Sequence, residues 1–453
     1  MIPDKTTTTQ GFRRIVMKEI RNSAGGVPGR GVASLMVLLL ALAACDFEVS
    51  NPGPVDDPQL NELGAHNAVV QGASFALSIA LWQLGYITGE TADEITRSGR
   101  NFCCPKAPPR VGELLRTQLE APTWNVTHRA RFVAEDATRR FEEIVGAEAS
   151  SYPPNAWAKL YAGYASRLLG EHMCTAFFDG GPPEPNIRYF ERAEAAFTEA
   201  IAVGQAAGVA EVVTAAHAGR ASVRGPWLGK WSEAVTDAQQ VPRAFRFQAV
   251  YSAVQENNYN FLQHMGAGAP WVDWTVWGSD IEGLYLNTGD PRIPWVDRGR
   301  TDTPMGLPLY EQRKYTSVAD NINLATGREM LLIRAEAALE AGDWGGAMLL
   351  LNELRSDLVS DLTGNPLPQL TAANAEEAWT HLKSERRLEL WLEGRRMPDL
   401  RRWIGDGTPG AQESMSHRIR LCFPVNNTEA DNNVHIDRAF GDNEPTNPTY
   451  IGG

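Results

Sequence analysis

The 453-residue chain has few residues of the kinds that carry catalysis, and it has none of the catalytic motifs that are recognised by their spacing. Its eight histidines are scattered singly, and it lacks a His-Glu-x-x-His metal motif, a nucleophile elbow and a phosphate-binding glycine loop. These absences argue against the enzyme classes that depend on those motifs. The sequence therefore predicts a protein that is not an enzyme, with no catalytic residue, no metal and no cofactor.

Cysteine is also scarce, with five residues in the whole chain. Four of them, Cys103, Cys104, Cys174 and Cys422, lie well beyond the N-terminal leader. The adjacent pair Cys103-Cys104 has no second closely spaced Cys or His pair to complete a zinc site. Because thiols tend to oxidise outside the cytoplasm, we expect disulfides rather than zinc, and four cysteines leave three complete pairings open.

An apolar run from Val32 to Ala44 is too short for an ordinary transmembrane helix. It follows a basic leader and ends in Ala43-Ala44-Cys45, which is the architecture of a bacterial lipoprotein signal. This predicts that residues 1–44 are a signal peptide and that the Cys45 thiol carries the lipid. The alternative is an uncleaved membrane anchor, and Met17-Lys18 offers a second start for the leader.

The chain has no excess of positive charge. Its formal net charge is −13, and because the leader itself is basic, the rest of the chain is more acidic still. An acidic surface repels phosphate backbones and anionic lipid headgroups, so neither is an expected partner. We expect no nucleic acid partner. Contact with the outer-membrane lipid is expected through acylated Cys45 alone.

Helical periodicity dominates the chain after a short polar stretch. Residues 45–59 are rich in proline and acidic groups and predict a flexible tether, followed by one domain over residues 60–453. Apolar residues recur at steps of three and four in four segments, which begin at Val126, Trp157, Phe190 and Ala347. Each segment is expected to form an amphipathic helix.

A short pattern then recurs between helices. Gly229-Lys230-Trp231-Ser232-Glu233-Ala234 and Gly342-Asp343-Trp344-Gly345-Gly346-Ala347 share the skeleton Gly-x-Trp-x-x-Ala, each after an alanine-rich helix. This pattern is tetratricopeptide-like, with the glycine ending the first helix of a pair. We predict a helix-pair scaffold over about 124–256 and 325–404. Residues 257–324, rich in Gly, Pro, Asp, Asn and aromatics, form a loop-rich insertion.

Two stretches carry a resemblance to a known family. The first runs from Arg328 to Leu339 and continues through Gly342-Asp343-Trp344 to Arg355; the second runs from Glu385 to Arg396 and into Asp399-Leu400-Arg401-Arg402-Trp403. In their order and spacing they resemble the SusD/RagB family. The charges of the second stretch are spaced for salt bridges along a helix, and we expect them to stabilise helix packing or to solvate a face rather than to act in catalysis.

The resemblance implies both a fold and a function. The fold would be mainly α, a tetratricopeptide-like scaffold of helix pairs (the SusD-like α-α superhelix) with a large loop-rich insertion. The function would be that of a surface-exposed outer-membrane lipoprotein of Bacteroidetes-like bacteria. It would capture glycans or other nutrients and act as a lid on a TonB-dependent barrel transporter.

Aromatic residues in the insertion are the first candidates for ligand contacts. Sugar rings stack on indole and phenol rings, while their hydroxyls require carboxylates, amides and guanidinium groups. Trp271, Trp274 and Trp277 lie within seven residues, and Tyr285 and Trp295 follow. Polar partners would come from Asp273, Asp280, Asn287 and Arg292. The alternative is that the tryptophans are a hydrophobic anchor for the insertion.

An earlier strip supplies a second set of candidates. It comprises Trp82, Tyr86, Glu90, Asp93, Glu94 and Arg97, where a helix gives way to a polar turn. The corresponding segment of the SusD/RagB family is similar, and by this resemblance Asp93, Glu94 and Arg97 would border the ligand groove. The alternative role for these polar groups is capping of the turn.

Together these observations predict a non-catalytic, lipid-anchored binding subunit that captures a glycan or an oligopeptide and passes it to the barrel. Two other functions are considered. One is a tetratricopeptide-like envelope scaffold that binds no small ligand. The other is a surface glycosidase, for which Asp273 and Asp280 would be the carboxylate pair.

Overall fold

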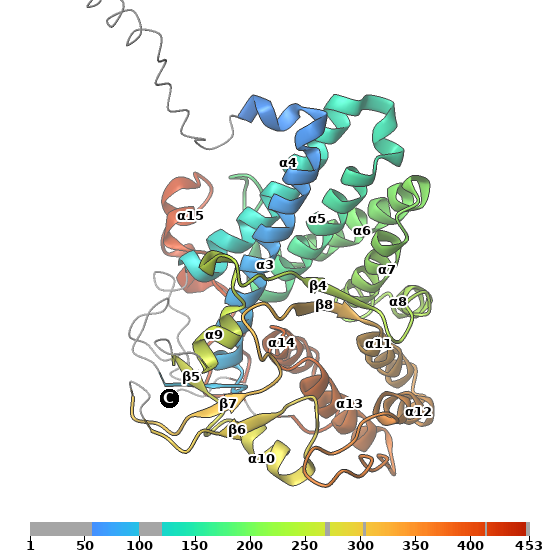
Figure 1. Cartoon of the computed structure of the whole chain (residues 1–453), viewed down its shortest axis with the longest axis vertical. Coiled ribbons are helices and arrows are strands. Elements are labelled where there is room, and N and C mark those ends of the chain that lie inside the picture. Colours follow the sequence, from blue (N-terminus) through green and yellow to red (C-terminus); the bar gives the residue numbers. More distant parts are fainter. Residues whose placement is uncertain (1–56, 99–119, 268–271, 302–304, 413–414, 450–453) are drawn as a thin grey trace, which may run out of the picture. The chain divides into compact units, whose positions relative to one another are not determined.

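The structure is a computed structural model that describes residues 57–98, 120–267, 272–301, 305–412 and 415–449. The predicted signal peptide, Cys45, most of the predicted tether, Cys103, Cys104 and Trp271 lie outside the described residues. The fold is mainly α (Figure 1), as the sequence predicts. The first described elements are two 3-10 helices, Asp57–Asn61 and Leu63–Ala65.

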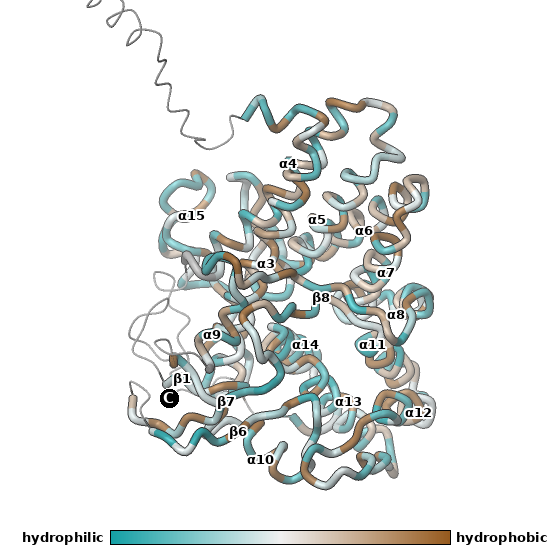
Figure 2. The backbone as a smooth tube through the Cα atoms, in the orientation of Figure 1, coloured by the Kyte–Doolittle hydropathy of each residue, from teal (hydrophilic) through white to brown (hydrophobic). Residues whose placement is uncertain are grey.

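Five consecutive helices build the first part of the scaffold: α4 (Val126–Val145), α5 (Pro153–His172), α6 (Ile187–Ala207), α7 (Ala210–Arg224) and α8 (Trp231–Ala238). The predicted stripes of α4 and α6 face the core, where Ala130, Ala137 and Phe141 are fully covered. Along these helices the tube in Figure 2 changes between hydrophobic and hydrophilic colours every few residues. By contrast, α5 is buried on nearly all sides because α3, α4, α6 and α7 surround it.

A long helix that the sequence reasoning did not assign to the scaffold lies at its centre. Helix α3 (His66–Thr91) packs against α4, α5, α9 and α14. Leu77, Leu81 and Leu84 are almost completely covered. The helix is long and apolar enough to cross a membrane by composition alone, but here those residues form the core of the folded body.

The two Gly-x-Trp-x-x-Ala copies are equivalent helix pairs. Gly229 and Gly342 both adopt left-handed backbone angles, with φ of 66° and 80°, which glycine alone adopts without strain. Trp231 begins α8 and Trp344 begins α12 (Trp344–Arg355), which follows α11 (Gly327–Glu340). Helix α11 packs on α7 and α8, so the two pairs are neighbours in space despite their separation in sequence (Figure 1).

The ends of the insertion are held together by two strands. β4 (Arg246–Ala249) pairs antiparallel with β8 (Ile322–Thr326), which brings the chain back to the point where it left the scaffold. The described residues between them contain only short elements: a 3-10 helix (Glu256–Asn258), α9 (Phe261–Ala267), β5 (Trp274–Thr275), α10 (Asp280–Thr288), β6 (Trp295–Asp297) and β7 (Tyr310–Gln312). β5 pairs with β1 (Thr96–Arg97), and β6 pairs with β7.

The charged stretch near residue 390 is not one continuous helix. Helix α13 (Ala375–Glu389) ends there, Leu392 and Gly394 take left-handed angles, and α14 (Arg396–Asp406) begins after the turn. Figure 2 draws α13 and α14 largely in hydrophilic colours. Nevertheless Arg386, Arg395 and Arg396 are buried, so these charges do not solvate a face, and their partners come from distant elements.

The C-terminal segment returns to the scaffold. Cys174 and Cys422 form a disulfide with an S–S distance of 2.11 Å, one of the pairs that the sequence left open. Next to it the Phe423 amide donates to the His172 carbonyl at 2.7 Å. The strands β2 (Thr175–Ala176) and β3 (Glu184–Pro185) pair nearby, and the last α-helix of the described residues is α15 (Asn427–Asn432), followed by a 3-10 helix (Phe440–Asn443).

Candidate functional site

Three half-buried aromatic side chains from separate elements of the insertion meet and form what we call the aromatic cluster: Tyr285, Trp295 and Tyr310. The rings of Trp295 and Tyr310 stack, with centroids 4.6 Å apart and planes 9° apart. Tyr285 leans against Trp295 with centroids 5.9 Å apart and planes at 54°. Stacked and tilted rings that keep part of their surface in water are suited to apolar faces of small ligands.

Backbone pairing explains why these rings meet. In the β6–β7 ladder Trp295 lies opposite Gln312 and Asp297 lies opposite Tyr310. Because side chains alternate along a strand, Trp295 and Tyr310 are diagonal neighbours on one face. Tyr285 is placed by α10, which ends at Gly289 with φ of 62°, and the Asp361 amide donates to the Gly289 carbonyl at 2.8 Å.

Two exposed carboxylates border the aromatic cluster. Burial and the nearby carboxylate of Asp361, which shares a hydrogen bond with the phenol, raise the pKa of Tyr285. On the other side, burial and the charge of Asp297 raise the pKa of Tyr310. Both acidic residues are exposed, and carboxylates can accept hydrogen bonds from donors such as sugar hydroxyls. The cluster therefore combines ring surface with polar acceptors.

The three predicted tryptophans have different positions. Trp271 lies outside the described residues. Trp274 is fully buried in the core, and its ring packs on Gly266 so closely that a methyl group there would overlap the indole. Trp277 is half-buried in the turn after β5. Trp274 thus has the anchoring position that the alternative interpretation expected, whereas Trp277 retains surface for a ligand.

The two aspartates contact different parts of the protein. Asp273 is buried, and burial raises its pKa to about 6 although Arg97 lowers it. Asp280, at the start of α10, is exposed and its carboxylate forms an ion pair with Arg387 at 2.9 Å. Asn287 is exposed on the same helix.

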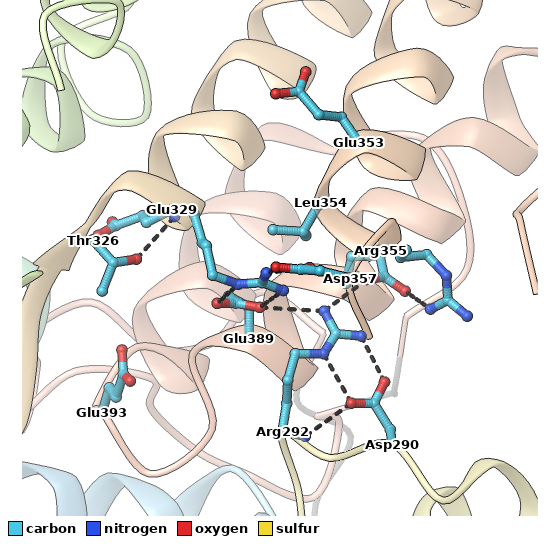
Figure 3. Close-up of polar contacts among 12 residues, drawn as sticks. Asp290, Arg292, Thr326, Glu329, Glu353, Leu354, Arg355, Asp357, Glu389 and Glu393 are labelled. Atoms are coloured by element: carbon cyan, nitrogen blue, oxygen red, sulfur yellow. Dashed lines mark hydrogen bonds and ion pairs between the residues drawn. The ribbon is translucent and has the colours of Figure 1, made fainter. Parts of the chain in front are cut away.

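Arg292 belongs to a network of ion pairs (Figure 3). Its guanidinium contacts Asp290 at 2.6 Å, Glu385 at 2.8 Å and Glu389 at 3.4 Å. Burial opposes the charge of Arg292, but these three carboxylates outweigh that effect and raise its pKa. Its donors are directed at protein carboxylates, and therefore its first role is to join the insertion to α13.

The early strip is mostly internal. Trp82 stacks on Phe261 with centroids 4.7 Å apart, and Tyr86 is buried. Glu90 and Glu94 are buried as well, and burial raises the pKa of Glu94 to about 7 despite the attraction of Arg396, Arg387 and Lys314.

The remaining two residues of the strip retain exposure. Asp93 forms ion pairs with Arg418 at 3.0 Å and with His417 at 3.3 Å. Arg97 on β1 is half-buried opposite Trp274. Asp93 lies in the turn that follows the end of α3 at Thr91, where its φ is 57°.

The sequence reasoning missed Tyr310, Asp297 and Asp361. Tyr310 lies in the strand-like run Leu309-Tyr310-Glu311-Gln312, which could have been paired with Trp295-Val296-Asp297. Nothing local pointed to Asp361, which follows α12 on the scaffold and meets Tyr285 only in the folded chain.

Comparison with known proteins finds a match to one family over part of the chain and shows the fold. Residues 324–450 match the SusD family. A SusD/RagB family protein from Bacteroides thetaiotaomicron aligns with a TM-score of 0.61 at 13% identity, covering 85% of this chain and 98% of that one. A SusD-like protein from Bacteroides fragilis gives a TM-score of 0.64 at 14% identity, covering 87% and 98%.

A third structure is described as a laminarin-binding SusD-like protein. It aligns with a TM-score of 0.60 at 14% identity, covering 85% of this chain and 99% of that one. A search of curated proteins finds no match.

Proposed function

We propose that this chain, which resembles the SusD/RagB family, is a non-catalytic glycan-binding protein of the outer membrane and that its ligand binds at the aromatic cluster. The observation that carries the proposal is the stacked pair Trp295–Tyr310 with Tyr285 beside it, bordered by exposed carboxylates. Trp277, Asp280, Asp93 and Arg97 keep exposed surface and are proposed as further contacts.

The geometry suggests which ring offers the main platform. The Tyr310 ring covers one face of the Trp295 indole, and the Tyr285 ring leans against it. Little of the indole surface is therefore free. Tyr310 is the outer member of the stack and can present its second face to a sugar. A single stacking contact contributes about 1 kcal/mol, so we expect weak binding that improves with glycan length.

Affinity electrophoresis tests this proposal. Purified protein is run through native gels that contain laminarin, xylan, dextran or mannan, laminarin being included because one structural neighbour binds it. We expect retardation by at least one glycan, and loss of that retardation in Tyr310→Ala and Trp295→Ala. Trp344→Ala is the matched control, since that ring is 37% exposed on the scaffold. Equal retardation of all three variants would place the ligand elsewhere.

Attachment and delivery form the second part of the proposal. The leader and Cys45 support a lipid anchor in the outer membrane, with the ligand face turned to the exterior and the cargo passed to a TonB-dependent barrel transporter. Metabolic labelling with palmitate should mark the wild-type protein and leave Cys45→Ala unlabelled. Affinity purification from detergent-solubilised outer membrane should recover a barrel transporter; recovery of other envelope proteins without a barrel would favour the scaffold function.

A further inference from the structure

A cleft of about 660 Å³ lies between the scaffold and the insertion, beside the aromatic cluster. Its walls are β4, β8, the segment after α10, the start of α11 and the end of α13. This volume is within the range of roughly 300–1,000 Å³ that is typical of ligand pockets. All of its lining residues belong to the described part of the chain.

Basic side chains outnumber acidic ones in this cleft. Six basic residues line it: Arg243, Arg246, Arg292, Arg313, Lys314 and Arg328. The acidic residues of the lining are Asp357, Glu389 and Glu393. The acids behind the wall, Asp290, Glu311 and Glu385, are accompanied by Arg298 and Arg355, so a basic excess persists when they are included.

The deep and the outer parts of the cleft differ in how their charges are paired. In the deep part Arg328 pairs with Glu389 at 2.7 Å and Lys314 pairs with Glu393 at 2.8 Å, and Arg292 is held as Figure 3 shows. At the outer part Arg246 is exposed and forms no ion pair with another described residue. Arg313 is exposed too, and it shares its partner Glu311 with Arg298. The unbalanced charge is therefore at the opening.

This opening adjoins the strand pair that carries the aromatic cluster. Pro294 lines the cleft and Trp295 follows it directly. The Arg313 amide donates to the Pro294 carbonyl at 2.7 Å, which fixes this arginine beside the strand pair that carries Trp295 and Tyr310. Because side chains alternate along a strand, Arg313 lies on the face of the β6–β7 pair opposite Trp295 and Tyr310, so a glycan that stacks on Tyr310 reaches Arg313 and Arg246 by passing round the edge of this pair.

We propose that this cleft selects glycans that carry negative charge, as carboxylate or sulfate groups on the sugar. The proposal rests on the proposed glycan-binding function and specifies the class of glycan. A local basic excess in a protein of net charge −13 attracts an anion to that place and to little else on the surface. Guanidinium groups bind carboxylate and sulfate through paired donors, which gives geometric selection beyond simple attraction.

Matched ligands and matched variants test the charge requirement. The probes are oligogalacturonate and its methyl ester, which share one backbone, together with a sulfated dextran oligosaccharide and its unsulfated form. Binding is measured by isothermal titration at 20 and 200 mM salt. The test variant is Arg246→Gln/Arg313→Gln. The control is Arg139→Gln/Arg188→Gln, which removes two positive charges from exposed arginines on α4 and α6.

We expect at least one charged probe to bind, its uncharged counterpart to bind at least tenfold more weakly, and higher salt to weaken the charged probe alone. The test variant should lose about tenfold in affinity for the charged probe, whereas the control should lose less than twofold. Equal loss in both double variants would mean that net charge, not the cleft, is responsible, and would overturn the proposal.

The remaining outcomes separate this proposal from the function on which it rests. If a neutral glycan binds through Tyr310 and neither charged probe binds better than its uncharged form, selection by charge is refuted and glycan binding stands. If no glycan binds, both proposals fail. If polyglutamate binds as tightly as the best charged glycan, the cleft takes acidic polypeptide, and the proposed ligand class is wrong.

Discussion

Replacing Glu94 by glutamine should stabilise the protein at pH 8 and change its stability little at pH 4.5. The Glu94 side chain is completely buried just beyond α3. Burial outweighs the attraction of Arg396, Arg387 and Lys314 and raises the pKa of the carboxyl to about 7 from 4.5. In the unfolded chain the same carboxyl ionises freely in water.

The sign and size of the effect follow from this difference. A carboxyl whose pKa is higher in the folded state has no cost below pH 4.5. Its cost grows between pH 4.5 and 7, and is constant above that. Raising the pKa from 4.5 to about 7 therefore lowers the free energy of unfolding by about 3 kcal/mol at high pH, at about 1.4 kcal/mol for each pKa unit. Glutamine has a similar shape and cannot ionise, so Glu94→Gln removes the cost.

Urea unfolding at pH 4.5 and pH 8, with the disulfide intact, measures the effect. We expect the free energy of unfolding of Glu94→Gln to exceed that of the wild type by about 2–3 kcal/mol at pH 8 and by less than about 0.5 kcal/mol at pH 4.5. Glu233→Gln, an exposed change on α8, should give the same small difference at both values. A destabilised Glu94→Gln at pH 8 would refute the reasoning, because it would mean that the ionised carboxylate is a net stabilising partner of its cations.

Asp399→Asn should lower the free energy of unfolding by about 3–5 kcal/mol, since it removes the carboxylate that pairs with Arg386 and Arg402 in a buried site. In urea unfolding, the double variant Asp399→Asn/Arg386→Met should lose less stability than the sum of the losses of the two single variants. Gly163→Ala places a methyl 2.6 Å from the Phe197 ring and should cost about 1–3 kcal/mol, and Phe197→Leu in the same chain should recover part of the loss. Under oxidising conditions the double variant Cys174→Ser/Cys422→Ser should be about 2–4 kcal/mol less stable than the wild type. Under reducing conditions the two proteins should be equally stable. Incubation with the bound glycan should release no reducing ends, and any release that Asp273→Asn or Asp280→Asn abolishes would favour the glycosidase.

Sequence periodicity predicted scaffold helices such as α4 and α6, but it did not predict helix α3. The apolar steps in α4 and α6 and the repeated Gly-x-Trp-x-x-Ala skeleton depend on local geometry, and Gly229 and Gly342 adopt the left-handed angles that such a skeleton requires. Helix α3 was not predicted because it is apolar on most sides and therefore has no single apolar stripe. Burial within a core removes the amphipathic signal on which the prediction relied.

The candidate site was harder to predict because the solvent exposure of a side chain depends on the tertiary fold. Trp274 and Trp277 are three residues apart in an aperiodic segment, yet one is fully buried and the other retains surface. The β1–β5 pairing and the packing on Gly266 decide this, and neither can be read from the local sequence. Tyr310 became a candidate only when its strand was seen to pair with that of Trp295.

The charged turn between α13 and α14 connects the part of the fold that resembles the family to the part that would bind ligand. Three ion pairs run from this region into the insertion: Arg387 to Asp280, Glu385 to Arg292 and Glu393 to Lys314. Buried ion pairs contribute little net stability, since desolvation offsets their attraction, but they require a specific arrangement of the elements that they join. The same turn therefore fixes α10 and the strands that carry the aromatic cluster relative to the scaffold.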